Sequence, residues 1–162
     1  MSWLGSTSEL VALTALELAL TDRYAGKEMA RRRKLVAKKA ENEKRPISKS
    51  ERWWVEYVSF ADLIKSMVER DGLTDDRIPM SQRCGPASKV IGRLTGETRP
   101  SLADIRNDLA HGAAFDGLPQ AGLLELVRDL INYAYRDWIL TQDQASGVSV
   151  VRSATRRAAE RC

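Results

Sequence analysis

Apolar residues recur at helical spacing along most of the chain. They come every three or four residues over 10–20, and the same spacing returns over 54–68, 102–109 and 123–138. Such a repeat gathers apolar side chains on one face of an α-helix. Strand-like alternation is confined to 148–151. The pattern therefore predicts an all-α fold, a helical bundle of four to five helices with short turns.

Capping signals predict where several of these helices begin. Ser6, Ser48 and Ser101 are each followed three residues later by an acidic residue, which is the arrangement of a capping box. Residues 24–44 contain many good helix formers and few strand formers, so a further basic helix is expected there, ending before Pro46. The glycines and prolines of 73–98 predict a long irregular link, with a short helix near 87–94.

Length and composition favour a single folded domain. The chain has 162 residues, of which 43% are hydrophobic, and this is enough to bury a proper core. No run of about 18 apolar residues predicts a membrane span, and no leader for export is recognised at the N-terminus. Cys84 and Cys162 are too far apart for a metal-like spacing, so a reduced, cytoplasmic protein is expected. We assign 1–141 to the helical domain and 142–162 to a basic C-terminal tail.

Charge is concentrated in one segment. Residues 23–45 hold ten Lys or Arg and three Glu, a local charge of +7, whereas the rest of the chain sums to −3. Such a stripe is typical of a phosphate-binding surface, and equally of a solvated helix face. The candidate RNA-binding residues are Arg31, Arg32, Arg33, Lys34, Lys38 and Lys39.

Aromatic residues follow the basic segment. Trp53, Trp54 and Tyr57 are able to stack bases, but the helical spacing of Trp54 and Tyr57 favours core packing, with Trp53 facing a partner. Core packing is the interpretation for Tyr133, Tyr135 and Trp138 as well.

The single histidine, His111, limits the chemistry. It excludes catalysis by paired histidines within one chain and histidine-based metal cages, and no glycine-rich phosphate loop is present. Asn107 precedes His111 by one helical turn, so the two share a face, and that face lies roughly 150° from the apolar stripe. Arg106 lies beside the stripe and reaches the same site only through its long side chain. An Arg five residues and an Asn four residues before a given histidine is an infrequent coincidence at this composition.

The segment Arg106-Asn107-Asp108-Leu109-Ala110-His111 resembles the R-N-x-x-x-H motif of HEPN ribonucleases. The longer string RNDLAHGAAFDGLP is similar to the HEPN half of CRISPR-associated CARF–HEPN effectors. The order of elements also fits, because in HEPN families the motif lies late in a helical bundle and another long helix follows.

Two features depart from the family. Position 113 is Ala where one toxin branch has tyrosine. No ligand-sensing β/α domain precedes the helices, so the sensor is expected to be missing, cut off, or on a separate chain as a sensor or regulatory protein.

The resemblance implies a metal-independent endoribonuclease that uses no cofactor, yields 2′,3′-cyclic phosphate and 5′-hydroxyl ends, and acts in antiviral defence, either CRISPR-associated or toxin-like. His111 suits proton transfer near neutral pH, and Arg106 offers a planar cation for the phosphate. Asn107 orients His111 or binds RNA. One histidine does not easily serve as both acid and base, so a homodimer with a composite site is expected.

Two other interpretations remain open at this point. One is a non-catalytic helical subunit that binds RNA or protein in a nucleoprotein complex. The other is Mg²⁺ held by Asp104 and Asp108, although helix capping explains these residues more simply.

Overall fold

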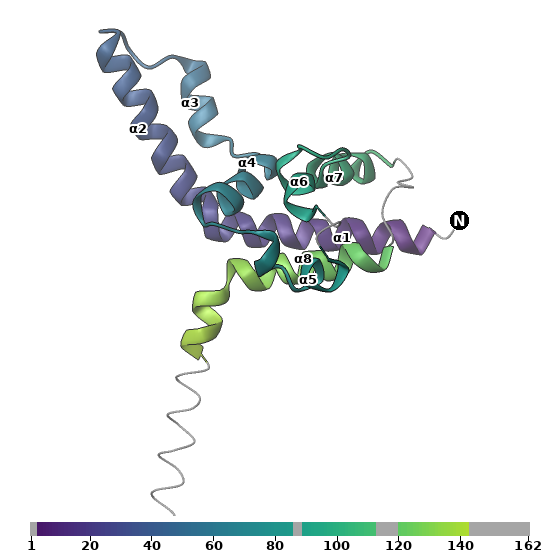
Figure 1. The fold of residues 1–162 in the computed structure, drawn as a ribbon. Coiled ribbons are helices and arrows are strands. Elements are labelled where there is room, and N and C mark those ends of the chain that lie inside the picture. Colours follow the sequence, from purple (N-terminus) through teal and green to yellow (C-terminus); the bar gives the residue numbers. More distant parts are fainter. Residues whose placement is uncertain (1–2, 86–88, 113–119, 143–162) are drawn as a thin grey trace, which may run out of the picture.

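The computed structural model describes residues 3–85, 89–112 and 120–142. All regular secondary structure in these ranges is helical, which confirms the prediction of an all-α bundle (Figure 1). The strand signal at 148–151 and the basic C-terminal tail lie outside the described residues. The helices are α1 (Trp3–Leu20), α2 (Gly26–Asn42), α3 (Lys49–Glu56), α4 (Phe60–Lys65), α5 (Pro79–Cys84), α6 (Val90–Thr95), α7 (Leu102–Ala110) and α8 (Gln120–Ala134), with the single turns η1 (Thr21–Ala25), η2 (Ser66–Arg70) and η3 (Asp75–Arg77).

The first two predicted helices are continuous with each other. Five residues of π-helix, η1, join α1 to α2, and the backbone stays helical at both junctions. Because α1 already begins at Trp3, Ser6 lies within this helix and is not the N-cap that the sequence indicated. A turn of π-helix changes the direction of a helix. The chain bends at this point, so that α2 leaves the bundle (Figure 1).

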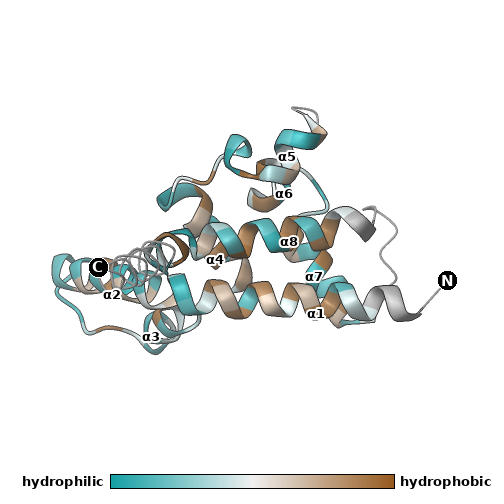
Figure 2. Ribbon diagram, turned by 90° about the horizontal axis from the view of Figure 1, so that it is seen from below, coloured by the Kyte–Doolittle hydropathy of each residue, from teal (hydrophilic) through white to brown (hydrophobic). Residues whose placement is uncertain are grey.

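The core lies between α1 and α8, which are side by side (Figure 2). Helices α4 and α7 pack against α1, and α5 packs against α8. Fully buried leucines and isoleucines fill the space between these helices, including Leu13, Leu16, Ile64, Ile105 and Leu130. The apolar stripes predicted from the sequence for α1, α7 and most of α8 therefore form the core. Leu124 and Trp138, predicted as buried, are exposed.

The predicted helix over 54–68 is divided into two. Residues 57–59 are not helical, and Ser59 begins α4 with a capping box of its own, in which Asp62 is the acidic partner. The break turns α3 away from the core, so Trp53, Trp54 and Tyr57 are exposed, with Trp53 at 62%. The prediction that Trp54 and Tyr57 pack in the core is wrong, because the helical repeat on which it depended ends at Tyr57.

The long link after α4 is more regular than expected. It contains η3, α5 and α6, and Pro79 occupies the first turn of α5, where its missing N–H costs nothing. The predicted stop at 71–72 is confirmed, since η2 ends at Arg70 and Gly72 adopts a positive φ of 73°. Across the described ranges, no helix is long and apolar enough to cross a membrane.

Asp71 joins three elements at one end of the bundle. Arg136 donates to both of its carboxylate oxygens at 2.8 Å, and the Tyr24 hydroxyl donates to Oδ2 at 2.6 Å. The hydroxyl of Tyr133 donates to the backbone carbonyl of Asp71 at 2.7 Å. The guanidinium of Arg136 lowers the pKa of Asp71 to about 2.

This lowered pKa predicts acid sensitivity. Above the ordinary pKa of an unfolded aspartate, near 3.9, Asp71 is ionised and its contacts contribute fully to stability. The contribution is lost as the pH falls through about 2, where folded Asp71 takes up a proton. We expect Asp71→Asn to lower the urea midpoint at about pH 6, and the gap from wild type to shrink between roughly pH 4 and pH 2. Asp108→Asn, on the exposed side of α7, is the control. A gap that stays constant with pH would contradict this role.

Candidate active site

Helix α7 carries the three predicted catalytic residues, and its own sequence explains its position. Ser101 caps the helix by accepting from the Asp104 backbone N–H at 3.1 Å, while the Asp104 carboxylate accepts from the Ser101 N–H at 2.9 Å. Leu102, Ile105 and Leu109 are buried, and they fix the helix against α1. The opposite face, with Asn107 and Asp108, is exposed.

Arg106 is held at the edge of the interface between α7 and α1. Its Nε and Nη2 atoms donate to Glu17 Oε2 at 3.0 and 2.8 Å. The side chains of Arg106 and Glu17 are 32% and 28% exposed, so the ion pair is accessible to solvent. The remaining nitrogen, Nη1, donates to Asn107 Oδ1 at 3.3 Å. The guanidinium is thus oriented from one side by Glu17 and from the other by Asn107.

His111 lies at the C-terminal end of α7. It is the C-cap residue, with φ −91° and ψ 7°, and its backbone N–H donates to the Asn107 carbonyl at 3.0 Å. Its side chain is exposed, and within the described ranges its imidazole makes no hydrogen bond or ion pair. The imidazole is therefore not held by another side chain of the described ranges.

The structure brings Arg106 and Asn107 together but gives Asn107 a partner other than His111. The amide oxygen of Asn107 accepts from Arg106, and the Asn107 backbone carbonyl accepts from the His111 N–H. Within the described ranges no hydrogen bond joins the Asn107 side chain to the imidazole, and the choice between its two predicted roles, orienting His111 or binding RNA, stays a prediction. The rest of the HEPN-like string, 113–119, lies outside the described residues.

Glu17 is the site residue that sequence reasoning missed. A signal was present, because Glu17 interrupts the apolar repeat of leucines along α1. A charged residue next to a buried stripe finds a partner or solvent, but nothing in the sequence indicates that this partner is Arg106, 89 residues away.

The carboxylate of Asp104 already binds residues close to it in sequence. Besides the cap, it forms an ion pair with Arg99, which lowers the pKa of Asp104 to about 2. Asp108 points away from the core on the exposed face. Within the described ranges, no group of three or more metal-ligating side chains comes together.

The basic segment divides into buried and exposed residues. Arg32 is only 3% exposed, and the prediction that it contacts RNA is wrong. Its Nε donates to Glu28 at 2.9 Å, its Nη1 donates to the carbonyls of Trp54 and Tyr57, each at 2.8 Å, and its Nη2 lies 2.8 Å from Asp62. Periodicity explains the error, because Arg32 lies on the same face of α2 as Val36 and Ala40, which pack inward.

Arg31 and the remaining basic residues are accessible to different degrees. Arg31 donates to Glu28 at 2.6 and 3.1 Å and is half-buried. Arg33, Lys34, Lys38 and Lys39 are exposed. In Figure 2, α2 is hydrophilic along most of its length, in keeping with a helix that projects from the core.

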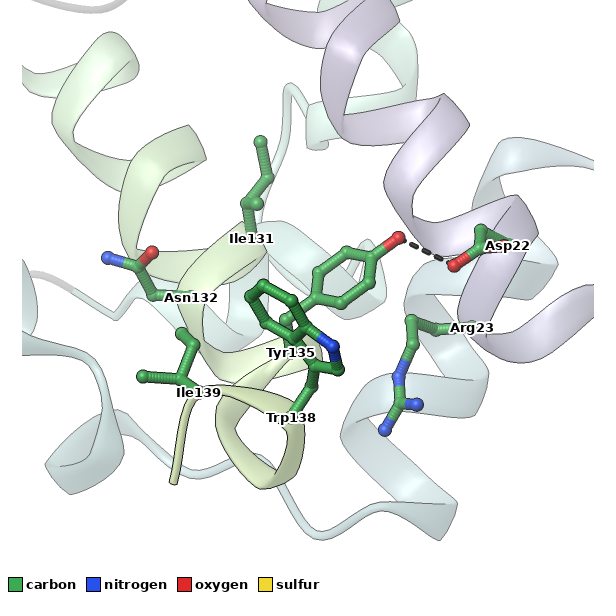
Figure 3. A pocket seen from close by; sticks show the side chains of 7 residues that line it. All are labelled: Asp22, Arg23, Ile131, Asn132, Tyr135, Trp138 and Ile139. Carbon is green, nitrogen blue, oxygen red and sulfur yellow. Dashed lines mark hydrogen bonds between the residues drawn. The ribbon is translucent and has the colours of Figure 1, made fainter. Parts of the chain in front are cut away.

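A cavity of about 530 Å³ lies at the end of α8, away from α7. Ile131, Tyr135, Trp138 and Ile139 form its apolar wall, and Asp22 and Arg23 form its rim (Figure 3). The Tyr135 hydroxyl donates to Asp22 at 2.7 Å, and this hydrogen bond raises the pKa of Tyr135. None of the residues predicted to be functional lines this cavity.

No protein-family model, curated protein or solved structure matches the chain. The residues of α7 and their surroundings are therefore the features from which a function is inferred.

Proposed function

We propose that this chain is a HEPN-like endoribonuclease that cleaves single-stranded RNA without a metal ion, in the cytoplasm and in antiviral defence. The observation that carries the proposal is the presentation of a cation and an imidazole from one helix. Arg106 is oriented at the edge of α7 by Glu17, and His111 is exposed at the end of the same helix. Neither side chain is buried in the core.

These two groups fit the chemistry of RNA cleavage. A base takes the proton of the ribose 2′-hydroxyl, the 2′-oxygen attacks the adjacent phosphorus, and the bond from phosphorus to the 5′-oxygen breaks. An acid then supplies a proton to the departing 5′-oxygen. An imidazole performs either transfer near neutral pH. A guanidinium stabilises the extra negative charge that develops on the phosphate oxygens. This stabilisation is strong when the cation is already held in place before the reaction.

A second copy of the chain completes the site. One imidazole per chain supplies one of the two proton-transfer groups at a time, and a symmetric dimer with α7 at its axis supplies two. The exposure of His111 and Asn107 leaves this face of α7 accessible to such a partner. A separate sensor or regulatory protein would control the assembled dimer.

Cleavage in EDTA tests this function. We expect the purified chain to cut single-stranded RNA in the presence of EDTA and to leave 2′,3′-cyclic phosphate and 5′-hydroxyl ends. RNA methylated at every 2′-oxygen is the matched substrate control, and it should stay intact because its nucleophile is blocked. Cleavage of the methylated RNA, or a strict need for added Mg²⁺, would contradict the proposed mechanism.

One observation favours a second candidate, a non-catalytic helical subunit that binds RNA. The pair of Arg106 and Glu17 also braces α7 against α1, which is a structural reason for an arginine at this position. In that case the chain would not cleave RNA, and His111→Ala would leave RNA binding unchanged.

Substitutions at Glu17 distinguish two roles of this residue, positioning the Arg106 guanidinium for catalysis and holding α7 against α1. We expect Glu17→Ala to lower kcat about tenfold, since Arg106 loses its anchor, while KM stays the same or falls because a negative charge near the phosphate is removed. Glu17→Gln keeps one hydrogen-bond acceptor and should restore part of kcat. The ion pair is partly exposed, so Glu17→Ala should cost no more than about 1 kcal/mol of stability. If activity is lost only in proportion to the fraction of unfolded protein, the role of Glu17 is to hold α7 against α1.

A further inference from the structure

The α2–α3 hairpin, residues 26–56, projects from the bundle and carries more positive charge than the chain as a whole, whose net charge is +4. It holds eleven Lys or Arg and five Glu, a net charge of +6. Figure 1 shows both helices leaving the core at the end where α1 bends into α2. A projecting, positively charged hairpin attracts a polyanion and repels another copy of itself.

Three aromatic side chains lie on the surface of this hairpin. Trp53 and Tyr57 stack on each other one helical turn apart, with ring centroids 4.8 Å apart and planes inclined by 12°. They are 62% and 56% exposed. Trp54 is partly exposed, and the guanidinium of Arg32 lies 4.6 Å from the centroid of its ring. Large aromatic groups left in water on a charged hairpin provide flat surfaces on which unpaired bases stack.

A groove between the two helices is lined by one of these aromatic residues and one of the basic residues. Trp54, Ser50 and Glu51 of α3 face Leu35, Val36 and Lys39 of α2 across a cavity of about 340 Å³. Lys39 and Trp54 are both exposed and both line this groove, so the groove combines a cation with an indole ring. This combination of a cation for the backbone and a ring for the base is what a single-stranded nucleic acid requires.

Buried contacts hold the hairpin in this shape. Arg32 ties α2 to the end of α3 through the carbonyls of Trp54 and Tyr57, and Val55 packs inward between the helices. At the tip, Arg45 forms an ion pair with Glu51 at 2.6 Å. The rings are thus displayed from a surface that is ordered before any ligand arrives.

We propose that the groove of Trp54 and Lys39, with the stacked pair of Trp53 and Tyr57 beside it, binds single-stranded RNA by base stacking and phosphate contact. The inference deepens the proposed function, because it names the surface that holds the substrate, and it depends on RNA being that substrate. The charge of the hairpin favours RNA over a second copy of the chain as the occupant.

Fluorescence anisotropy with a labelled single-stranded RNA of about 16 nucleotides tests the inference. Every variant is made in the full chain with His111→Ala, so that the RNA stays intact. We expect Trp53→Ala and Tyr57→Ala each to weaken binding by about 5- to 150-fold, the value of one stacked base. Trp138→Ala is the matched control, because Trp138 is equally exposed, at 58%, but lies beyond α8. An RNA duplex of the same length should bind more weakly than the single strand.

The salt dependence separates stacking from charge. Lys39→Ala should reduce the slope of log affinity against log salt by about 0.7, whereas Trp53→Ala should leave the slope unchanged. Lys65→Ala, which removes an exposed lysine from α4, is the control and should change neither the affinity nor the slope.

The possible outcomes test the RNA-binding surface and the nuclease activity separately. If Trp53→Ala and Tyr57→Ala bind RNA as tightly as the parent chain, the inference is overturned, even where the wild-type chain cleaves RNA. If these variants bind as tightly but change the oligomeric state, the hairpin is an interface between copies, and the inference is again overturned. If RNA binding depends on the hairpin but the wild-type chain never cleaves, the inference stands and the nuclease proposal fails.

Discussion

His111→Ala is expected to lower the rate of RNA cleavage by about 10²–10⁴-fold, the usual contribution of a proton-transfer group. His111 is the only imidazole in the chain, so no neighbouring histidine can take over its role. Its side chain is exposed, and within the described ranges it has no hydrogen-bonded partner. We therefore expect the free energy of unfolding to change by less than about 0.5 kcal/mol. Single-turnover cleavage and denaturant unfolding measure the two effects separately.

Two further variants make this result specific. His111→Gln keeps a polar side chain of similar size but does not titrate, so it should be as inactive as His111→Ala. Asp108→Ala, an exposed change on the same helix, should keep most of the activity, although Asp108 is close enough to tune the site. If His111→Ala cleaved RNA at the wild-type rate, α7 would not be the catalytic helix.

Arg32→Ala is expected to destabilise the fold by at least about 3 kcal/mol, the largest stability effect we predict. The substitution removes one of the cations that neutralise Glu28, which is 2% exposed, and it leaves the carbonyls of Trp54 and Tyr57 without their donor. In a chain of this size, such a loss lowers the melting temperature by roughly 6 °C or more. Unfolding in guanidinium chloride is the measurement.

The neighbouring residue supplies the control. Arg33→Ala removes the same charge from an exposed position, and it should change the free energy of unfolding by no more than about 0.5 kcal/mol. Arg32→Lys keeps the charge but loses the planar fork that reaches four partners, so it should fall between wild type and Arg32→Ala. Equal stability of Arg32→Ala and Arg33→Ala would contradict the buried network.

Local signals predicted the helices well because helix formation depends on residues close in sequence. The capping boxes at Ser48 and Ser101 and the stop at Gly72 are local, and the structure confirms all three. The break at 57–59 was missed, although Ser59 and Asp62 form the same kind of capping box. The apolar repeat runs through both helices and hid the boundary between them.

The site was predicted only in part, because its contacts are not local. Arg106, Asn107 and His111 share a helix, as their spacing indicates. The partner of Arg106 comes from α1, and the partners of Arg32 come from α2, α3 and α4, so spacing along one helix does not identify them. Tertiary packing likewise decides that Arg32 is buried while Arg33 is exposed, two neighbours that the charge pattern treated as equivalent.

The most direct test of the composite site is a mixing experiment in EDTA. Wild-type chains are combined with increasing amounts of His111→Ala chains, subunits are allowed to exchange, and the rate of RNA cleavage per total chain is measured. If each site uses one imidazole from each of two copies, the rate falls as the square of the wild-type fraction, to about one quarter in an equal mixture. A rate that falls in direct proportion to that fraction, or does not depend on His111 at all, would contradict the account.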